Sequence, residues 1–188
     1  MIDIGGGLPV NFASEEVRPG FSDFAELLRA KVPELFSGEF QVKTEFGRSI
    51  LAKNGFMASR VEYTKEAGGR RIVITHAGAQ VATRTVFMPR DWAIRVSVFD
   101  GAGHSRTGEP VTQDFAGPLC FAGDMIATDR ALPAAQMGDL VVMHDTGAYY
   151  FSSPFMYNAL PACAVYGVET KSNGQVDFSC WRAQQTLE

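Results

Sequence analysis

The stretch EFGRSILAKNGFMASRVEYTKE, residues 45–66, marks the point at which the sequence changes character. Before it, the chain has the pattern of a β-α-β unit, which is the repeating unit of a parallel sheet or barrel. Within it, GFMASRVEYTKE alternates apolar and polar residues, as a half-buried strand does. The sequence therefore predicts an α+β protein with two parts, a β-α-β piece over residues 1–50 and an all-β domain, a barrel or a sandwich, over residues 51–188.

The first part contains two short strands with a helix between them. The apolar start of the chain runs into three glycines, and EFQVKTEFG supplies the second strand. Ser22 is the expected N-cap of a helix from Asp23 to about Leu35, which Pro33 should bend or shorten. A complete eight-stranded β/α barrel needs about 250 residues, so if this piece belongs to such a barrel, it is the last βα units of it.

The second part shows strands separated by turn residues. The glycine pair in KEAGGRR predicts a hairpin between GFMASRVEYTKE and RRIVITHAG. Further strands are expected in DWAIRVSVFDGAG, DLVVMHDTGAYYF and ACAVYGVET, and no window after residue 50 has helical periodicity.

Composition and charge narrow the class of protein. Apolar residues make up 46% of the 188, and the net charge is −4, so we expect a globular chain without a nucleic-acid partner. No apolar run is long enough for a membrane span, and the N-terminus lacks the features of a signal peptide. The 3 cysteines have no metal-binding spacing, so a cytoplasmic protein with thiols and no metal site is expected.

Several short motifs carry residues that bind or react. A carboxylate and a guanidinium close together at the end of a strand, as in Glu45-Phe46-Gly47-Arg48, usually hold a ligand. Three glycines after a strand can cradle a phosphate, although a tight turn explains them as well. Cys120 in GPLCFAGD is a possible acid or nucleophile, and a small buried hydrophobic residue is the alternative. The hydroxyl-rich HDTGAYYFSSPFMYN can bind phosphate or simply form a turn between strands.

Taken in order, these motifs resemble one family, the fold-type III pyridoxal-phosphate decarboxylases, which include the diaminopimelate, ornithine and carboxynorspermidine decarboxylases. The family pattern is a Gly-Gly-Gly run, Glu-Pro-Gly-Arg, Gly-Pro-x-Cys-x-x-x-Asp and Gly-Ala-Tyr. The chain matches it at residues 5–7, at 45–48 except for Phe46, at 117–124 and at 147–149. The resemblance extends from Asp3 to about Asn158, and SILAKNGFMASRVEYTKE is similar to the diaminopimelate branch.

The resemblance implies roles for the matching residues. Gly5, Gly6 and Gly7 would cradle the phosphate of pyridoxal 5′-phosphate (PLP), and Gly47, Arg48 and Tyr149 would clamp it. Glu45 would bind the pyridine nitrogen and keep it protonated, so that the ring accepts the electrons freed when CO₂ leaves. Cys120 would return a proton to the substrate carbon. In the family this cysteine enters the site of a neighbouring subunit, which implies a homodimer with shared active sites.

The positions that would contact the amino acid substrate depart from the family. His76 stands, 28 residues after Arg48, where the family has an aspartate, and Phe121 follows Cys120 where an acid is usual. Neither replaces a carboxylate that faces the distal amino group of a basic amino acid, so the substrate is not identified. Arg84, eight residues after His76, matches a substrate-binding arginine of the diaminopimelate branch.

The family's Schiff-base lysine has no counterpart in this sequence. None of the five lysines lies in the expected strand context near the start of a barrel: Lys31, Lys43, Lys53, Lys65 and Lys171. Three hypotheses follow. The chain is the C-terminal part of a decarboxylase and inactive alone, or it is half of a split enzyme whose partner supplies the lysine, or it is a non-catalytic binding or assembly module.

Overall fold

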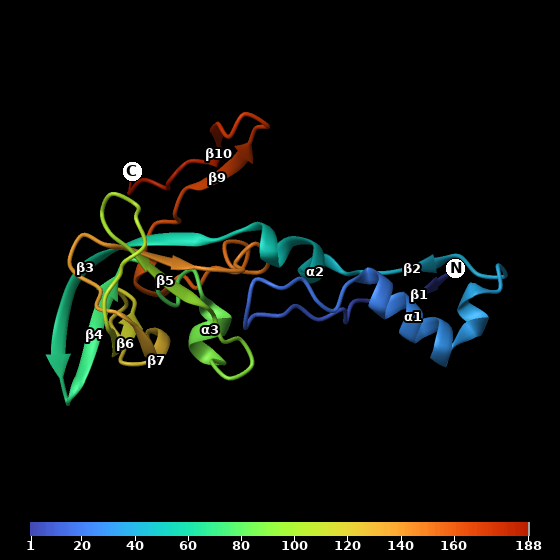
Figure 1. Ribbon diagram of the computed structural model, residues 1–188, viewed down its shortest axis with the longest axis horizontal. Helices are drawn as coiled ribbons and strands as arrows, with labels where there is room; N and C mark the ends of the chain where they lie inside the picture. The colour runs from blue at the N-terminus through green and yellow to red at the C-terminus, as the bar shows by residue number, and fades with distance from the viewer. Residues whose placement is uncertain (188) are drawn as a thin grey trace. The chain divides into compact units, whose positions relative to one another are not determined.

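The computed structural model describes residues 1–187, which form two compact units. The first is Met1–Phe155 and the second begins at Met156 (Figure 1). Over the described residues, no helix combines the length and the apolar character that a membrane crossing requires. The predicted boundary at residue 50 is not where these units divide, and it stays a prediction about domains.

The first 43 residues form the predicted β-α-β unit. Strands β1 (Ile2–Asp3) and β2 (Val42–Lys43) pair in parallel, and helix α1 (Phe21–Lys31) lies between them in the chain. The predicted start of the helix was wrong: Gly20 is the N-cap, and the Asp23 carboxylate accepts its backbone N–H at 2.7 Å. The helix ends before Pro33, where the short 3₁₀ helix η1 (Pro33–Phe36) begins, as expected of a residue with no N–H to donate.

The stretch that follows β2 forms two short helices that the sequence did not predict. They are α2 (Gly47–Leu51) and the 3₁₀ helix η2 (Ala52–Asn54). Phe46 precedes them and is only 8% exposed, because its ring packs against Phe21 and Phe24 of α1 at centroid distances of 5.7 and 5.1 Å. The residue that replaces the family's proline therefore anchors this stretch to α1.

A six-stranded mixed sheet dominates the first unit (Figure 1). Its order is β5-β8-β3-β4-β6-β7, antiparallel throughout except for the parallel pair β4–β6. The predicted hairpin is confirmed, with Gly68 and Gly69 both at positive φ in its turn. The bounds are β3 (Met57–Ala67), β4 (Arg70–Thr75), β5 (Val96–Phe99), β6 (Pro110–Ala116), β7 (Met125–Pro133) and β8 (Leu140–Met143).

Besides α2 and η2, three further elements of this unit were not predicted. Helix α3 (Thr83–Phe87) contradicts the expectation of no helix after residue 50, and at five residues it is too short to show a helical period. Strands β6 and β7 lack a clean alternation because irregularities in register interrupt their pairing. The core of this unit includes Val61, Val73, Ile94, Phe115, Ile126, Val141 and Met143.

The second unit is a hairpin of β9 (Val165–Thr170) and β10 (Val176–Arg182), preceded by the 3₁₀ helix η3 (Tyr157–Ala159). Its β9 strand confirms the prediction from ACAVYGVET. Cys163 and Cys180 lie in this unit and are exposed, like Cys120 in the first. The fold is thus α+β with a mixed, mostly antiparallel sheet; the barrel origin of the N-terminal part is taken up below as a proposal.

Candidate cofactor and substrate site

The glycine run and Glu45 meet where the two parallel strands end. The backbone N–H of Glu45 donates to the carbonyl of Gly5 at 2.8 Å, and a Cβ added to Gly6 would lie 3.3 Å from the carbonyl oxygen of Glu45. Gly5 and Gly7 have φ of +69° and +100°, which residues with a side chain rarely adopt, and neither would meet an atom within 4 Å of an added Cβ. At this edge, the backbone of Gly5 and Gly7 is therefore not covered by other atoms, and Glu45 lies next to it.

Two guanidinium groups lie against the same pair of aromatic rings. The central carbon of Arg48 lies 4.2 Å from the ring centroid of Trp92 and 5.6 Å from that of Tyr149. The corresponding distances for Arg84 are 4.6 and 5.1 Å. The rings therefore hold two like charges in one place through cation–π contacts, which offset part of their mutual repulsion.

Arg48 also has an unused hydrogen-bond donor. Its Nε is buried and has no partner within the part of the chain that the structure describes. A buried donor without a protein partner is costly, so a water molecule or a ligand oxygen should accept from it. An anion with several oxygens, such as a phosphate, would satisfy it.

Tyr149 reaches this position because the chain around it is tightly constrained. The N–H groups of Thr146 and Gly147 donate to the carbonyls of Gly55 and Ala52 at 2.9 and 3.0 Å, which ties the turn to the end of α2–η2. Tyr149 itself has a φ of +67° and is 42% exposed. The stretch after Arg48 therefore fixes the place of Tyr149.

Tyr150 has the opposite environment from its neighbour. It is 5% exposed, and its hydroxyl lies 2.9 Å from Thr85 Oγ1 in α3. Burial raises the pKa of the Tyr150 phenol, and the bond to Thr85 lowers it by a smaller amount. Tyr150 anchors the turn in the core, while Tyr149 stays accessible.

A second anchor of the turn is the buried carboxylate of Asp145. It is 4% exposed and accepts hydrogen bonds from Lys53 Nζ at 3.3 Å and from Arg95 Nη2 at 3.0 Å. Arg95 also binds Glu15 at 2.5 Å, and this contact holds the pKa of Glu15 below its usual range. Ion pairs thus join the loop after the glycine run to the turn that carries Tyr149.

The Cys120 loop is built around Asp124. This carboxylate is 3% exposed and accepts the backbone N–H groups of Ala79 and Leu119 at 2.6 and 2.8 Å. Gly78 and Gly117 pack against it so closely that a Cβ on either would overlap its oxygens. Asp124 therefore shapes the loop, and Cys120 is exposed on it.

The two positions that depart from the family lie in different surroundings. The ring of Phe121 stacks on Phe87 of α3 with centroids 5.9 Å apart and an interplanar angle of 7°. His76 Nε2 lies 2.7 Å from Glu62 Oε1 on the neighbouring strand β3, and its side chain is 67% exposed. Phe121 is thus part of an aromatic cluster, whereas His76 forms a surface contact.

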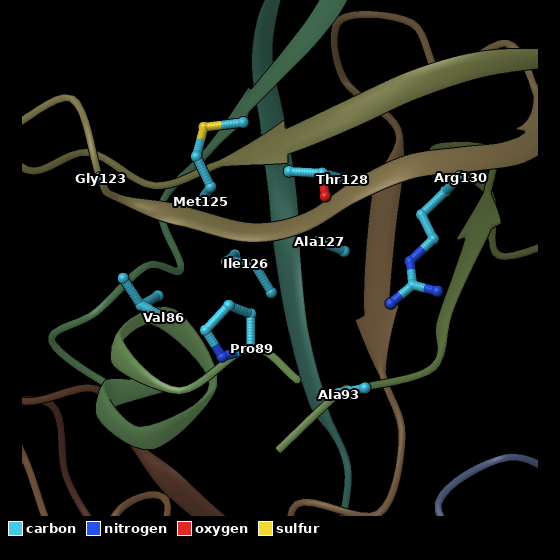
Figure 2. A pocket seen from close by; sticks show the side chains of 9 residues that line it. All are labelled: Val86, Pro89, Ala93, Gly123, Met125, Ile126, Ala127, Thr128 and Arg130. Atoms are coloured by element: carbon cyan, nitrogen blue, oxygen red, sulfur yellow. The ribbon is translucent and has the colours of Figure 1, made fainter. Parts of the chain in front are cut away.

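A cavity of about 270 Å³ lies next to the Cys120 loop, whose Gly123 lines it (Figure 2). Figure 2 shows that α3 and the residues after it form one wall and β7 the other. None of the residues predicted for the site lines it; the lining residues are Val86, Pro89, Ala93, Gly123, Met125, Ile126, Ala127, Thr128 and Arg130.

The structure thus collects the predicted residues into three groups. Gly5–Gly7 lie with Glu45, Arg48 and Arg84 lie with Tyr149, and Cys120 lies next to Phe121. Sequence reasoning missed Trp92, which was assigned to a strand, and it gave Asp124 no role although the motif contained it. A lone tryptophan carries no signal of its partners, whereas Asp124 directly follows Gly123 at the end of the loop, where a carboxylate can accept backbone N–H groups.

Comparison with known proteins identifies the family. Residues 35–147 match the model of the pyridoxal-dependent decarboxylase, C-terminal sheet domain. The chain belongs to this family. The resemblance predicted from the four motifs is therefore confirmed.

Three similar proteins illustrate the decarboxylase relationship. Diaminopimelate decarboxylase of Aquifex aeolicus is 29% identical over 176 residues, which are 91% of this chain and 39% of the relative. The crystal structure of Helicobacter pylori diaminopimelate decarboxylase with L-lysine has a TM-score of 0.78 at 28% identity, over 98% of this chain and 42% of that one. The structure of SrLDC with PLP and cadaverine has a TM-score of 0.70 at 25% identity, over 84% and 39%. The chain spans about two fifths of these relatives.

Proposed function

We propose that this chain is the C-terminal part of a PLP-dependent amino acid decarboxylase, and that it supplies one edge of the cofactor site and the proton donor. The observation that carries the proposal is the convergence of Arg48, Arg84 and Tyr149, with the Nε of Arg48 buried and unpartnered. A phosphate group suits this arrangement because a guanidinium fork matches its oxygens.

The remaining residues would orient the cofactor and handle the proton. The open backbone of Gly5–Gly7 would approach the phosphate, and the Glu45 carboxylate would accept the N–H of the pyridine ring. When bound, PLP supplies an acceptor for the electron pair that CO₂ leaves behind. Cys120 Sγ would then give its proton to the substrate carbon, for which its exposed position is suitable.

The lysine that attaches the cofactor would come from outside this sequence. An amine that forms an imine must lose its proton, and the hydrogen bond that Lys43 donates to Asp3 opposes this because it raises the pKa of Lys43. Lys53 is engaged in an ion pair, since its Nζ lies 3.3 Å from the buried carboxylate of Asp145. We therefore propose that β1 and β2 are the last strands of a β/α barrel whose other strands carry that lysine. The homodimer with shared sites and the cytoplasmic location stay predictions.

The test is to isolate the protein that carries this chain from its source cells through a C-terminal tag, and to measure its intact mass and its CO₂ release. A mass well above 20.4 kDa, with PLP-dependent CO₂ release from an amino acid, would support the proposal. Activity that requires a second, co-purifying polypeptide would indicate a split enzyme. A mass of 20.4 kDa without activity or bound PLP would indicate a non-catalytic module.

Two substitutions in that protein test the assigned roles. Arg48→Lys keeps the charge but loses the fork, so we expect PLP to dissociate at least about tenfold more readily in an equilibrium titration of bound cofactor. Cys120→Ala should slow turnover or change the product distribution while PLP binding stays the same. Unchanged turnover and products would show that Cys120 is not the proton donor.

A further inference from the structure

Three phenylalanines from separate parts of the chain form an aromatic ledge beside Cys120. Phe87 stacks on Phe121, and its ring meets that of Phe155 edge-on with centroids 5.4 Å apart and an interplanar angle of 88°. Phe87 is 54% exposed. The cluster is therefore held together by its own ring contacts and still presents apolar surface.

Helix α3 joins this aromatic ledge to the arginine pair. Arg84 and Phe87 are three residues apart in α3, so they are neighbours on its surface. The segment that carries Phe155 is tied to the same helix, since the N–H of Phe155 donates to the carbonyl of Gln80 at 3.2 Å and Thr83 Oγ1 donates to the carbonyl of Ser153 at 3.0 Å. One short helix thus presents positive charge towards Tyr149 and aromatic surface towards Cys120.

The Cys120 loop offers no carboxylate to a cationic ligand. Asp124 is the one acidic residue in GPLCFAGD, it is 3% exposed, and both of its oxygens accept backbone N–H groups. Phe121 instead follows Cys120 directly in the loop. An ammonium group placed against these rings would gain a cation–π contact but no carboxylate partner from this loop, and that gain is smaller than the cost of removing its water.

We propose that the amino acid substrate of this site ends in an apolar, uncharged side chain that lies on the aromatic ledge. The inference rests on the proposed decarboxylase function and specifies its substrate class. The proposal sets the chain apart from the solved relatives described above, whose bound L-lysine and cadaverine carry a distal amine.

The test compares lysine with norleucine, which is lysine without the distal ammonium group. In the protein isolated from source cells and loaded with PLP, we expect kcat/KM for norleucine to exceed that for lysine by about tenfold or more. The dissociation constants of both amino acids, followed by tryptophan fluorescence, should show the same order. Phe121→Glu should reverse the preference, while the matched variant Phe121→Leu should keep it.

The possible outcomes separate the ledge from the proposed function. CO₂ release with lysine equal to or better than norleucine would overturn the ledge assignment and leave the decarboxylase function in place. A preference for 2-aminoadipate would overturn it as well, because the distal carboxylate would then bind Arg84. An unchanged norleucine preference in Phe121→Glu, with a lower melting temperature or an altered oligomeric state, would show that polypeptide covers the ledge. No CO₂ release from any amino acid would overturn the function and the ledge together.

Discussion

Gly55 and Gly147 lie backbone against backbone: a Cβ added to Gly55 would come 2.7 Å from the Cα of Gly147. Gly55 has extended backbone angles, φ −147° and ψ 151°, which any residue can adopt. Only the close approach requires glycine here. This contact joins the segment after Arg48 to the turn before Tyr149, and so fixes the two sides of the proposed phosphate site relative to each other.

Gly55→Ala should therefore destabilise the protein by about 1–3 kcal/mol, the usual cost of forcing a methyl group into packed surroundings. Urea unfolding measures this change. Gly47→Ala is the matched control, because an added Cβ there meets nothing within 4 Å. Equal stability of Gly55→Ala and the wild type would show that the two segments separate at little cost.

Asp145→Asn tests the ion pairs behind the Tyr149 turn. Asp145 has a φ of +60°, and asparagine tolerates this conformation, so the substitution removes the charge without adding backbone strain. Lys53 and Arg95 would lose a buried partner, and we expect a loss of about 3 kcal/mol in the free energy of unfolding.

Asp129→Asn is the control for this variant. Asp129 also has a positive φ, 55°, and binds Arg70 at 2.8 Å, but its side chain is 64% exposed. An exposed pair contributes about 0–1 kcal/mol, so this variant should remain close to the wild type. Similar losses in the two variants would mean that burial of Asp145 does not strengthen its ion pairs.

Asp124→Ala should cost about 3 kcal/mol, because it leaves the N–H groups of Ala79 and Leu119 without the carboxylate that accepts them. Asp100→Ala is matched to it: Asp100 also accepts two backbone N–H groups, those of Ala102 and His104, but at an exposed turn. The chemical denaturation midpoint should fall much further for Asp124→Ala. The same fall in both variants would contradict a special role for the buried carboxylate.

The pH dependence of stability should include a contribution from Asp114. Hydrogen bonds from Arg70 lower the pKa of this carboxyl below its usual 3.8. Because the folded-state pKa is the lower one, the ionised carboxylate stabilises the fold fully above about pH 4 to 5, and this contribution disappears as the pH falls through the folded-state pKa.

Asp114→Asn should therefore flatten the acid limb of a plot of unfolding free energy against pH from 7 to 2. Glu66→Gln, in the β3–β4 hairpin that carries Arg70, removes an exposed carboxylate that lies 3.3 Å from Arg71, and should leave the limb steep. Parallel curves for wild type and Asp114→Asn would show that Asp114 titrates alike in the folded and unfolded states.

Local patterns in the sequence predicted the elements that depend on neighbouring residues. The β-α-β start and the turn at Gly68–Gly69 follow from glycine positions and apolar periodicity. The prediction of Ser22 as the helix N-cap was wrong. Gly20 is the N-cap, and the Asp23 carboxylate accepts its backbone N–H. Helix α3 is held by contacts with the Tyr150 segment and not by its own periodicity.

The sequence predicted which residues belong to the candidate site, but it did not predict how these residues are arranged in space. Ordered motifs indicated Arg48, Arg84 and Tyr149, and the structure brings them together, although their roles stay proposals. Trp92, which lies between the two guanidiniums and completes the group, makes contacts that depend on the tertiary fold alone. The same holds for the stack of Phe121 on Phe87, since nothing near either residue in the sequence points to the other.

The order of strands in the sheet has a consequence for the folding of the chain during synthesis. Strand β3 pairs on one side with β4, which follows directly, and on the other with β8, which the ribosome adds about 75 residues later. The β3–β4 hairpin can form early, but one of its edges stays unpaired until Met143 has emerged. Pairing over such a sequence separation is slow, so the newly made chain is exposed to wrong edge pairing for that interval.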